Sequence, residues 1–277
     1  MSDSSDPSVD TVERRVILSF APGRSLAFKI RTLLKALVST IVLTLWSLLM
    51  LAVAVITLFR ARRLYNEYLA KWLAKFILWQ WNIDVVVHRK GEPPGGQVIY
   101  ISNHSSTIDM FAVISLGLVR CRYFLFGPLR RIIPLGIIAT VMGTFFTCPQ
   151  TQSEKRARIF QRADRILHKT GESVYLTPEG ERVTTGDIGH FNKGAFHLAT
   201  SLKVPIVPFY IQIPKHVDPG AGIDATPGQI QIYFEDPIQT NDWVQEELIK
   251  NRGKVRDMFV GYSEKYGSLP VSVQSRG

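Results

Sequence analysis

This chain of 277 residues has few cysteines and lacks the residue spacings of common metal sites. The only two cysteines, Cys121 and Cys148, lie far apart and form no Cys-x-x-Cys motif. This argues against a disulfide framework or a structural zinc site, and it fits a reducing cytoplasmic environment for the main domain. The six histidines show no His-Glu-x-x-His or comparable spacing, which argues against a metallohydrolase.

Acidic residues are also few relative to basic ones. Asp and Glu total 23 against 33 Lys and Arg, a formal charge of +10 that favours anionic partners. The sequence has no helix-turn-helix, zinc-finger or RNA-recognition signature, so we do not expect nucleic acid as the partner. Anionic lipid, a phosphorylated substrate or an acidic carrier protein remain.

Long apolar runs are absent except for one, which excludes a polytopic transporter. Residues 36–59 form 24 positions without a formal charge. As a helix they would extend about 36 Å, enough for a hydrocarbon core of roughly 30 Å. The run starts too far into the chain for an ordinary signal peptide, and no cleavage pattern follows it. A full span and a dip into one leaflet both fit, and a buried core helix is the alternative.

The segments beside this run complete the expected domain organisation. Residues 1–35 are predicted to be a disordered, then basic, N-terminal tail, with residues 1–13 lacking apolar periodicity. Residues 36–82 are predicted to be a membrane-associated helical segment and residues 83–277 a catalytic domain. Within 61–82, an interfacial amphipathic helix is predicted from apolar side chains at helical spacing, with a helix packed on the core as the alternative: Leu64, Tyr68, Trp72, Phe76 and Trp79.

Short β-rich runs alternate with helical runs after residue 82, which predicts an α/β fold with a mixed sheet flanked by helices. Helices are expected after Ser106, before Gly143, over 154–169 and over 242–266. Strands are expected at residues 83–88, 97–102, 173–177, 204–211 and 229–235.

A histidine and a carboxylate follow the second predicted strand. His104 and Asp109 are five residues apart, and on a regular helix they would point about 140° apart. They can meet only if His104 lies in the turn before a helix, with Ser105, Ser106 or Thr107 near the N-cap. Asp109 could then orient the imidazole, leaving its other nitrogen as a general base, whereas a purely structural histidine is the alternative.

A second polar cluster follows the predicted strand at 173–177. Glu179, Gly180 and Arg182 place a carboxylate, a flexible residue and a guanidinium at a strand end, where open α/β sheets bind ligands. Arg182 could hold a phosphate or a carboxylate. Lys193 adds a further cation downstream, and residues 204–208 (Val-Pro-Ile-Val-Pro) form a stiff apolar stretch.

Taken in this order and spacing, these motifs resemble the glycerolipid acyltransferase family, the lysophosphatidic acid acyltransferases and their relatives, over roughly residues 83–240. Asn103-His104-x4-Asp109 matches the family's Asn-His-x4-Asp motif. The resemblance implies that His104 is the general base, that Asp109 is its partner, and that Asn103 lies with the substrate. Pro178-Glu179-Gly180-x-Arg182 matches the Pro-Glu-Gly-x-Arg motif, which implies acceptor binding by Glu179, Gly180 and Arg182.

Three departures affect the acceptor site. The family has an arginine six residues after the glycine that corresponds to Gly143, and this chain has Pro149 there. Arg130 and Arg131 could replace that arginine. The lysine of the Phe-Lys-x-Gly block is shifted to Lys193, and the threonine before Arg182 is Glu181.

The resemblance implies an O-acyltransferase that moves a fatty acyl group from acyl-CoA or acyl carrier protein to lysophosphatidic acid, giving phosphatidic acid. No bound cofactor or metal is expected. The protein is predicted to lie on the inner membrane, with its catalytic domain on the cytoplasmic side and an anionic membrane surface as a partner. Two alternatives remain: the same chemistry on another acceptor, such as a lyso-ornithine lipid or another lysophospholipid, and a membrane lipid-binding protein without turnover.

Overall fold

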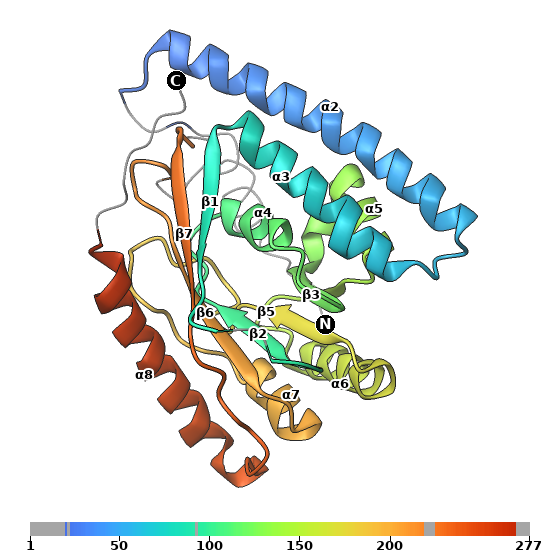
Figure 1. The fold of residues 1–277 in the computed structure, drawn as a ribbon, viewed down its shortest axis with the longest axis vertical. Helices are drawn as coiled ribbons and strands as arrows, with labels where there is room; N and C mark the ends of the chain where they lie inside the picture. The colour runs from blue at the N-terminus through green and yellow to red at the C-terminus, as the bar shows by residue number, and fades with distance from the viewer. Residues whose placement is uncertain (1–19, 21–22, 92–93, 219–224, 270–277) are drawn as a thin grey trace, which may run out of the picture.

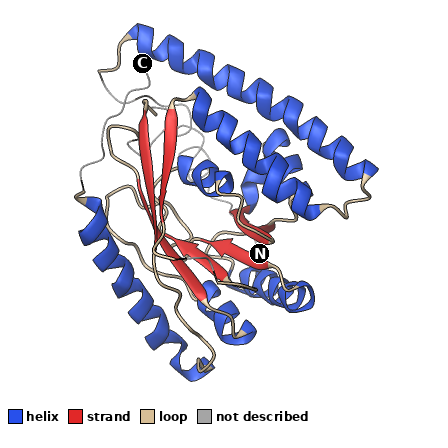
Figure 2. Cartoon of the chain, in the orientation of Figure 1, coloured by secondary structure: helices blue, strands red, loops and turns tan. Residues whose placement is uncertain are grey.

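The computed structural model describes residues 20, 23–91, 94–218 and 225–269. The expected disordered stretch 1–13 lies outside them. A seven-stranded sheet forms the centre of the molecule, and helices cover both of its faces (Figures 1 and 2). The predicted α/β class with a mixed, helix-flanked sheet is therefore confirmed.

The sheet has the order β1-β7-β6-β2-β5-β3-β4. Neighbouring strands are parallel except for the antiparallel pair β6 and β7. The carboxyl ends of five strands, from β6 to β4 in this order, therefore meet at one edge. The strands are β1 (Ile83–His88), β2 (Ile99–Ser102), β3 (Cys121–Phe126), β4 (Phe145–Thr147), β5 (Ser173–Leu176), β6 (Ile206–Gln212) and β7 (Gly228–Phe234).

Five of these strands lie where the sequence predicts strands, whereas β3 and β4 were not predicted. β3 carries Arg122, a charged residue that argues against a buried strand until its tertiary partner is known. β4 has only three residues, too few for a period-2 pattern. The helix α7 (Gly194–Leu202) was also not predicted, since it is short and begins at a glycine.

Two groups of helices cover the sheet. One face carries α2 (Leu26–Ile56), the π-helical η1 (Leu64–Ala70), α3 (Lys71–Gln80), α4 (Ile108–Ser115) and α5 (Ile133–Val141). The other carries α6 (Ser153–Thr170), α7 and α8 (Leu248–Gly267). Short 3₁₀ turns lie at η2 (Gly127–Arg131) and η3 (Gln245–Glu247). Each group forms a separate apolar core with its side of the sheet.

Helix α2 begins at Leu26, ten residues before the apolar run, so part of the expected basic tail is helical. It lies lengthwise against α3 and α5 (Figure 1). Polar contacts hold it there: Ser39 Oγ donates to Gln80 Oε1 (2.6 Å), and Trp46 Nε1 donates to Leu69 O (3.1 Å). It is long and apolar enough to cross a membrane, yet only 22% of its most apolar window is buried.

Helix α3 has two different apolar faces. Leu73, Ala74, Ile77 and Leu78 are buried in the domain. The aromatic residues of the predicted amphipathic stripe point outward and remain exposed: Tyr68 by 56%, Trp72 by 59%, Phe76 by 39% and Trp79 by 58%. The segment therefore packs on the core through one face while presenting an aromatic face to its surroundings.

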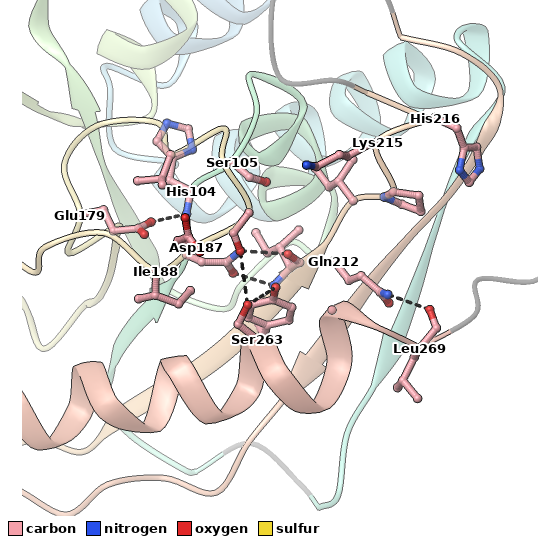
Figure 3. A pocket seen from close by; sticks show the side chains of 18 residues that line it. His104, Ser105, Glu179, Asp187, Ile188, Gln212, Lys215, His216, Ser263 and Leu269 are labelled. Atoms are coloured by element: carbon pink, nitrogen blue, oxygen red, sulfur yellow. Dashed lines mark hydrogen bonds between the residues drawn. The ribbon is translucent and has the colours of Figure 1, made fainter.

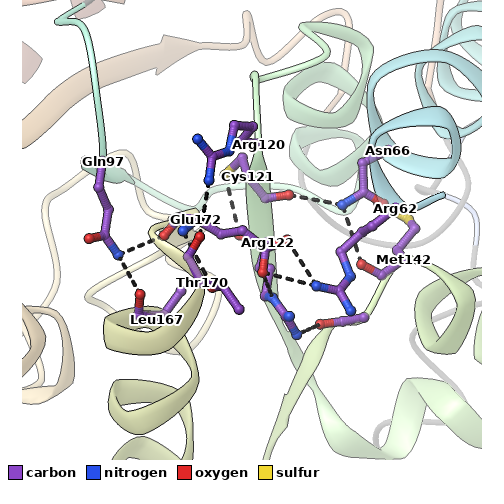
Figure 4. A network of polar contacts seen from close by, with 11 residues as sticks. Arg62, Asn66, Gln97, Arg120, Cys121, Arg122, Met142, Leu167, Thr170 and Glu172 are labelled. Atoms are coloured by element: carbon purple, nitrogen blue, oxygen red, sulfur yellow. Dashed lines mark hydrogen bonds and ion pairs between the residues drawn. The ribbon is translucent and has the colours of Figure 1, made fainter. Parts of the chain in front are cut away.

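A largely buried ion-pair network joins β3 to the residues just before η1 and β5 (Figure 4). Glu172 accepts from Arg122 Nε at 2.7 Å and from Arg62 Nη1 at 2.9 Å. Burial by itself raises the pKa of Glu172, but hydrogen bonds from Arg62 and Arg122 outweigh it and lower that pKa below its ordinary value. The ion pair with Glu172 thereby offsets the free-energy cost of burying the Arg122 guanidinium in β3.

We expect Glu172→Gln to lower the free energy of unfolding by about 3 kcal/mol at neutral pH, because it leaves the buried Arg122 guanidinium without a counter-charge. The folded-state pKa of Glu172 is depressed, so its stabilisation is complete above the unfolded-state pKa and is lost as pH falls through the folded-state value. Urea denaturation at several pH values tests this. Glu154→Gln, which removes an exposed charge on α6, is the control; equal effects of both variants would contradict the expectation.

Candidate active site

The candidate site lies at the edge of the sheet where the parallel strands end. Directly after β2, the Asn103 amide makes two hydrogen bonds to β6, from Nδ2 to Ile211 O (2.9 Å) and to Oδ1 from Ile211 N (2.8 Å). The side chain is buried. Both of its polar atoms are therefore engaged within the protein, and the pair of bonds holds the two strand ends together where the chain turns toward His104.

His104 and Asp109 meet in the turn between β2 and α4. His104 Nδ1 lies 2.9 Å from Asp109 Oδ2, which also accepts from Ser105 N (2.7 Å) and Ser106 N (3.0 Å). Ser106 Oγ accepts from Ile108 N (3.0 Å) at the start of α4. The contact expected from the spacing is present, with His104 in the turn before the helix and Ser106 at its beginning.

The environment of this pair determines its proton arrangement. Asp109 is 1% exposed, whereas the His104 side chain is 25% exposed. A carboxylate is only an acceptor, so Nδ1 carries the proton in the neutral ring and Nε2 is left with a free lone pair. An oriented, partly exposed imidazole of this kind can accept a proton from a bound hydroxyl.

Glu179, in the loop after β5, contacts the turn that carries His104. Its carboxylate is 4% exposed and accepts from His104 N (2.6 Å) and Gly189 N (2.8 Å). Burial raises the pKa of Glu179, while these two backbone N–H groups act in the opposite direction. The carboxylate thus connects the β5 loop to the backbone of His104.

The rest of the β5 loop is held by Asn192. Asn192 Nδ2 donates to Glu179 O (2.7 Å) and to Pro178 O (3.1 Å). Gly180 has φ = +73°, and a Cβ there would lie 2.8 Å from Asn192 Nδ2, so both the backbone and the packing require glycine. Arg182 Nη1 donates to Thr107 Oγ1 (2.8 Å), which brings its guanidinium to the start of α4.

A cavity of about 560 Å³ adjoins this cluster (Figure 3). His104 and Glu179 line one side of it, and Gln212, Lys215 and Ser263 line other parts. The sequence analysis singled out none of the last three. Lys215 could have been found, since it follows β6 at the same sheet edge, but Ser263 comes from α8, whose docking no local pattern reveals.

The remaining expected site residues are more dispersed. Arg130 and Arg131 lie in η2, which follows β3 at this sheet edge, and both are exposed. Lys193 precedes α7, and its charge acts on His197, which contacts Gln245 rather than the His104 cluster.

One cation that the sequence analysis did not consider lies beside Pro149. Arg156, in the first part of α6, donates from Nη1 to Cys148 O at 3.0 Å. Its guanidinium therefore reaches the end of β4, where the chain lacks the arginine of the family pattern. The first turn of a helix that follows a strand lies near the carboxyl end of that strand. The position of Arg156 early in α6 was therefore a signal in the sequence for this contact.

The described residues contain no cluster of three or more His, Cys, Asp or Glu side chains that could hold a metal ion. The chemistry that the arrangement offers is proton transfer at His104 Nε2, next to a cavity. The catalytic and binding roles of these residues stay predictions.

Comparison with known proteins gives one family match. A family model described as Acyltransferase matches residues 84–212, which contain both the His104 and the Glu179 loops. The chain is 28% identical over 183 residues to a chloroplastic 1-acyl-sn-glycerol-3-phosphate acyltransferase of Brassica napus, covering 65% of this chain and 52% of that protein. It is 26% identical over 217 residues to the 1-acyl-sn-glycerol-3-phosphate acyltransferase of Saccharomyces cerevisiae, covering 74% and 70%.

The chain spans about half the length of the Brassica napus and Arabidopsis thaliana relatives that it matches. Among solved structures, it is similar to the 1-acyl-sn-glycerophosphate acyltransferase PlsC of Thermotoga maritima, with a TM-score of 0.73 and 21% identity. That likeness covers 88% of this chain and 97% of the other, so the two share a fold that includes most of the described elements.

Proposed function

We propose that the chain is a glycerolipid acyltransferase, on the strength of the Acyltransferase family match at residues 84–212, and that it transfers a fatty acyl group from an acyl thioester to the free hydroxyl of a lysophospholipid. The observation that carries this proposal is the His104 ring held by the buried Asp109 carboxylate beside a cavity at the sheet edge. An oriented histidine without a protein nucleophile suits a reaction in which the substrate supplies the hydroxyl.

The proposed reaction uses one base for two proton transfers. His104 Nε2 takes the hydroxyl proton as the acceptor oxygen attacks the thioester carbonyl carbon, and Asp109 stabilises the imidazolium. The tetrahedral intermediate then collapses, the carbon–sulfur bond breaks, and the imidazolium returns the proton to the leaving thiolate. The products are the new ester and a free thiol, and no acyl-enzyme forms. The donor is proposed to be acyl-CoA or acyl carrier protein, which present the same thioester.

We propose lysophosphatidic acid as the acceptor, because the relatives are named 1-acyl-sn-glycerol-3-phosphate acyltransferases. Its phosphomonoester requires cations near His104. Arg182 is held at the start of α4 by Thr107 and supplies one of them. Arg156 is our candidate for the second, since its guanidinium occupies the surroundings of Pro149. Arg130 and Arg131 are the alternative source.

We also propose that the protein attaches to one leaflet of the inner membrane from its cytoplasmic side. The contacts of α2 with the α3 segment run from Ser39 to Trp46, and Thr57 at its end contacts Tyr65. A helix held along the domain in this way cannot stand perpendicular to a bilayer while the domain stays in water. The outward apolar residues of α2 and the aromatic face of α3 would instead enter the interface.

His104→Ala should lower acyl transfer by about 10²- to 10⁴-fold, because the base is lost while the binding groups remain. The assay uses membranes carrying each variant, a thioester donor, and lysophosphatidic acid, a lyso-ornithine lipid and diester lysophospholipids as acceptors. His168→Ala on α6, which removes an exposed histidine, is the matched control.

Three outcomes of this assay differ in meaning. Transfer to lysophosphatidic acid that disappears in His104→Ala supports the whole proposal. Transfer only to another acceptor keeps the mechanism and reassigns the substrate. Wild-type membranes that transfer to none of the acceptors, while the folded protein binds lysolipid, would favour a lipid-binding protein without turnover.

Arg156→Gln should raise KM for lysophosphatidic acid about tenfold, since a charge-assisted hydrogen bond to the phosphate is lost. KM for a diester lysophospholipid should change much less. Arg162→Gln, an exposed position on the same helix, is the control. A larger effect of the Arg130→Gln/Arg131→Gln double variant would transfer the role to η2.

The two ends of α2 should be accessible from the same side of the membrane. Single cysteines at Leu26 and Arg60 can be introduced after replacing the buried Cys121 and Cys148 by serine. A membrane-impermeant maleimide then labels inverted or right-side-out vesicles. Labelling of both positions from the cytoplasmic side is expected, and labelling from opposite sides would show that α2 spans the bilayer.

A further inference from the structure

A second cavity, of about 510 Å³, lies at the opposite end of the strands from His104. It opens between the turn that follows α2 and the starts of β3 and β5. Four arginines and two glutamates contribute to its lining, so its formal charge is +4 − 2 = +2. We call it the arginine cavity; the charged lining residues are Arg60, Arg62, Arg63, Arg120, Glu67 and Glu172.

The two carboxylates neutralise only part of this charge. Glu172 pairs with Arg62 and also with Arg122, which is not among the residues lining the cavity (Figure 4). Glu67 pairs with Arg63 (3.2 Å) and accepts from the backbone N of Arg120 (2.9 Å). Among the described residues, neither the Arg60 nor the Arg120 guanidinium has a carboxylate partner.

The Arg120 guanidinium is nevertheless fixed in place. Its Nη2 donates to Thr170 O at 3.0 Å, at the end of α6. This contact uses one of the five donors of the side chain and leaves the others for a ligand. A guanidinium that is positioned by a carbonyl and lacks a counter-ion is suited to bind a phosphate oxygen.

Exposed apolar side chains lead into the arginine cavity from the end of α2, and we call them its apolar rim. Phe59 lines the cavity and is 51% exposed, while Ile56 (80% exposed) and Leu58 (67%) come just before it in the chain. Exposed apolar side chains beside cations match the two layers of a membrane surface, the acyl chains and the charged headgroups. A soluble anion would need only the cations, so the exposed apolar side chains beside them favour a membrane lipid as the ligand.

The backbone around the arginine cavity is unusual as well. Five non-glycine residues in the described parts of the chain have positive φ. Two of them, Phe59 (58°) and Arg120 (47°), line this cavity, and Leu58 (51°) directly precedes Phe59. Such conformations are costly for residues with a Cβ and persist where surrounding structure imposes them, often at ligand sites.

We propose that the arginine cavity binds the phosphate headgroup of an anionic membrane phospholipid, with Ile56, Leu58 and Phe59 entering the acyl layer beside it. The inference rests on the proposed membrane attachment and is independent of acyl transfer. It gives the protein a second attachment point at the far end of the sheet from His104. Two separated contacts would fix the orientation of the domain on an anionic surface.

Vesicle flotation of the full-length protein tests this proposal. Arg60→Gln/Arg120→Gln should lower binding to phosphatidylglycerol-containing vesicles about tenfold or more, and leave binding to pure phosphatidylcholine vesicles unchanged. Arg158→Gln/Arg162→Gln removes the same charge from exposed positions on α6 and should have a much smaller effect. Equal losses in both double variants, or unchanged binding of the first, would overturn the proposal.

Two further measurements separate the remaining explanations. Arg60→Gln alone breaks no side-chain hydrogen bond or ion pair among the described residues, so a binding loss in this variant at an unchanged melting temperature excludes misfolding. Inorganic phosphate alone should not change the melting temperature of the wild type. A rise that Arg60→Gln/Arg120→Gln abolishes, together with unchanged vesicle binding, would overturn the lipid assignment in favour of free phosphate. Because the readout is binding, failure of this proposal is distinct from failure of acyl transfer.

Discussion

The candidate site depends on a single buried carboxylate. Asp109 accepts hydrogen bonds from the His104 ring and from the backbone of Ser105 and Ser106, so one side chain shapes the turn and orients the imidazole. Hydrogen bonds to a charged acceptor are stronger than those to a neutral one, and burial protects them from competition by water. These hydrogen bonds together fix the position of His104. In this way a residue outside any helix or strand is held in place for proton transfer.

The parallel strands on either side of β2 provide the frame for this turn. β2 lies between β6 and β5, and all three end at the same edge. Asn103 joins the histidine loop to β6, and Glu179 joins it to the loop after β5. Parallel neighbours place such loops side by side, and each loop is then secured by buried polar contacts to the next.

Charged residues lie at both ends of the sheet, in two different arrangements. At the carboxyl end of the strands lies the Asp109-held histidine, where a negatively charged acceptor is proposed to bind, and Arg182 contacts Thr107 at the start of α4. At the opposite end, Arg122 and Arg62 share Glu172 in a buried network, and further arginines line a cavity beside an apolar rim. The exposed apolar residues of α2 and α3 form the face that is proposed to enter the membrane interface.

The sequence by itself determined the α/β class, five of the seven strands, and the meeting of His104 with Asp109. These depend on local periodicity and on a turn geometry that five residues can encode. Only the tertiary structure decided that β3 is a buried strand, because the Arg122 guanidinium is accommodated there by Glu172, which directly precedes β5. The same holds for the position of α2 against α3 and for the cavities. Each requires residues distant in the chain to come together, and periodicity along one segment carries no information about its partners.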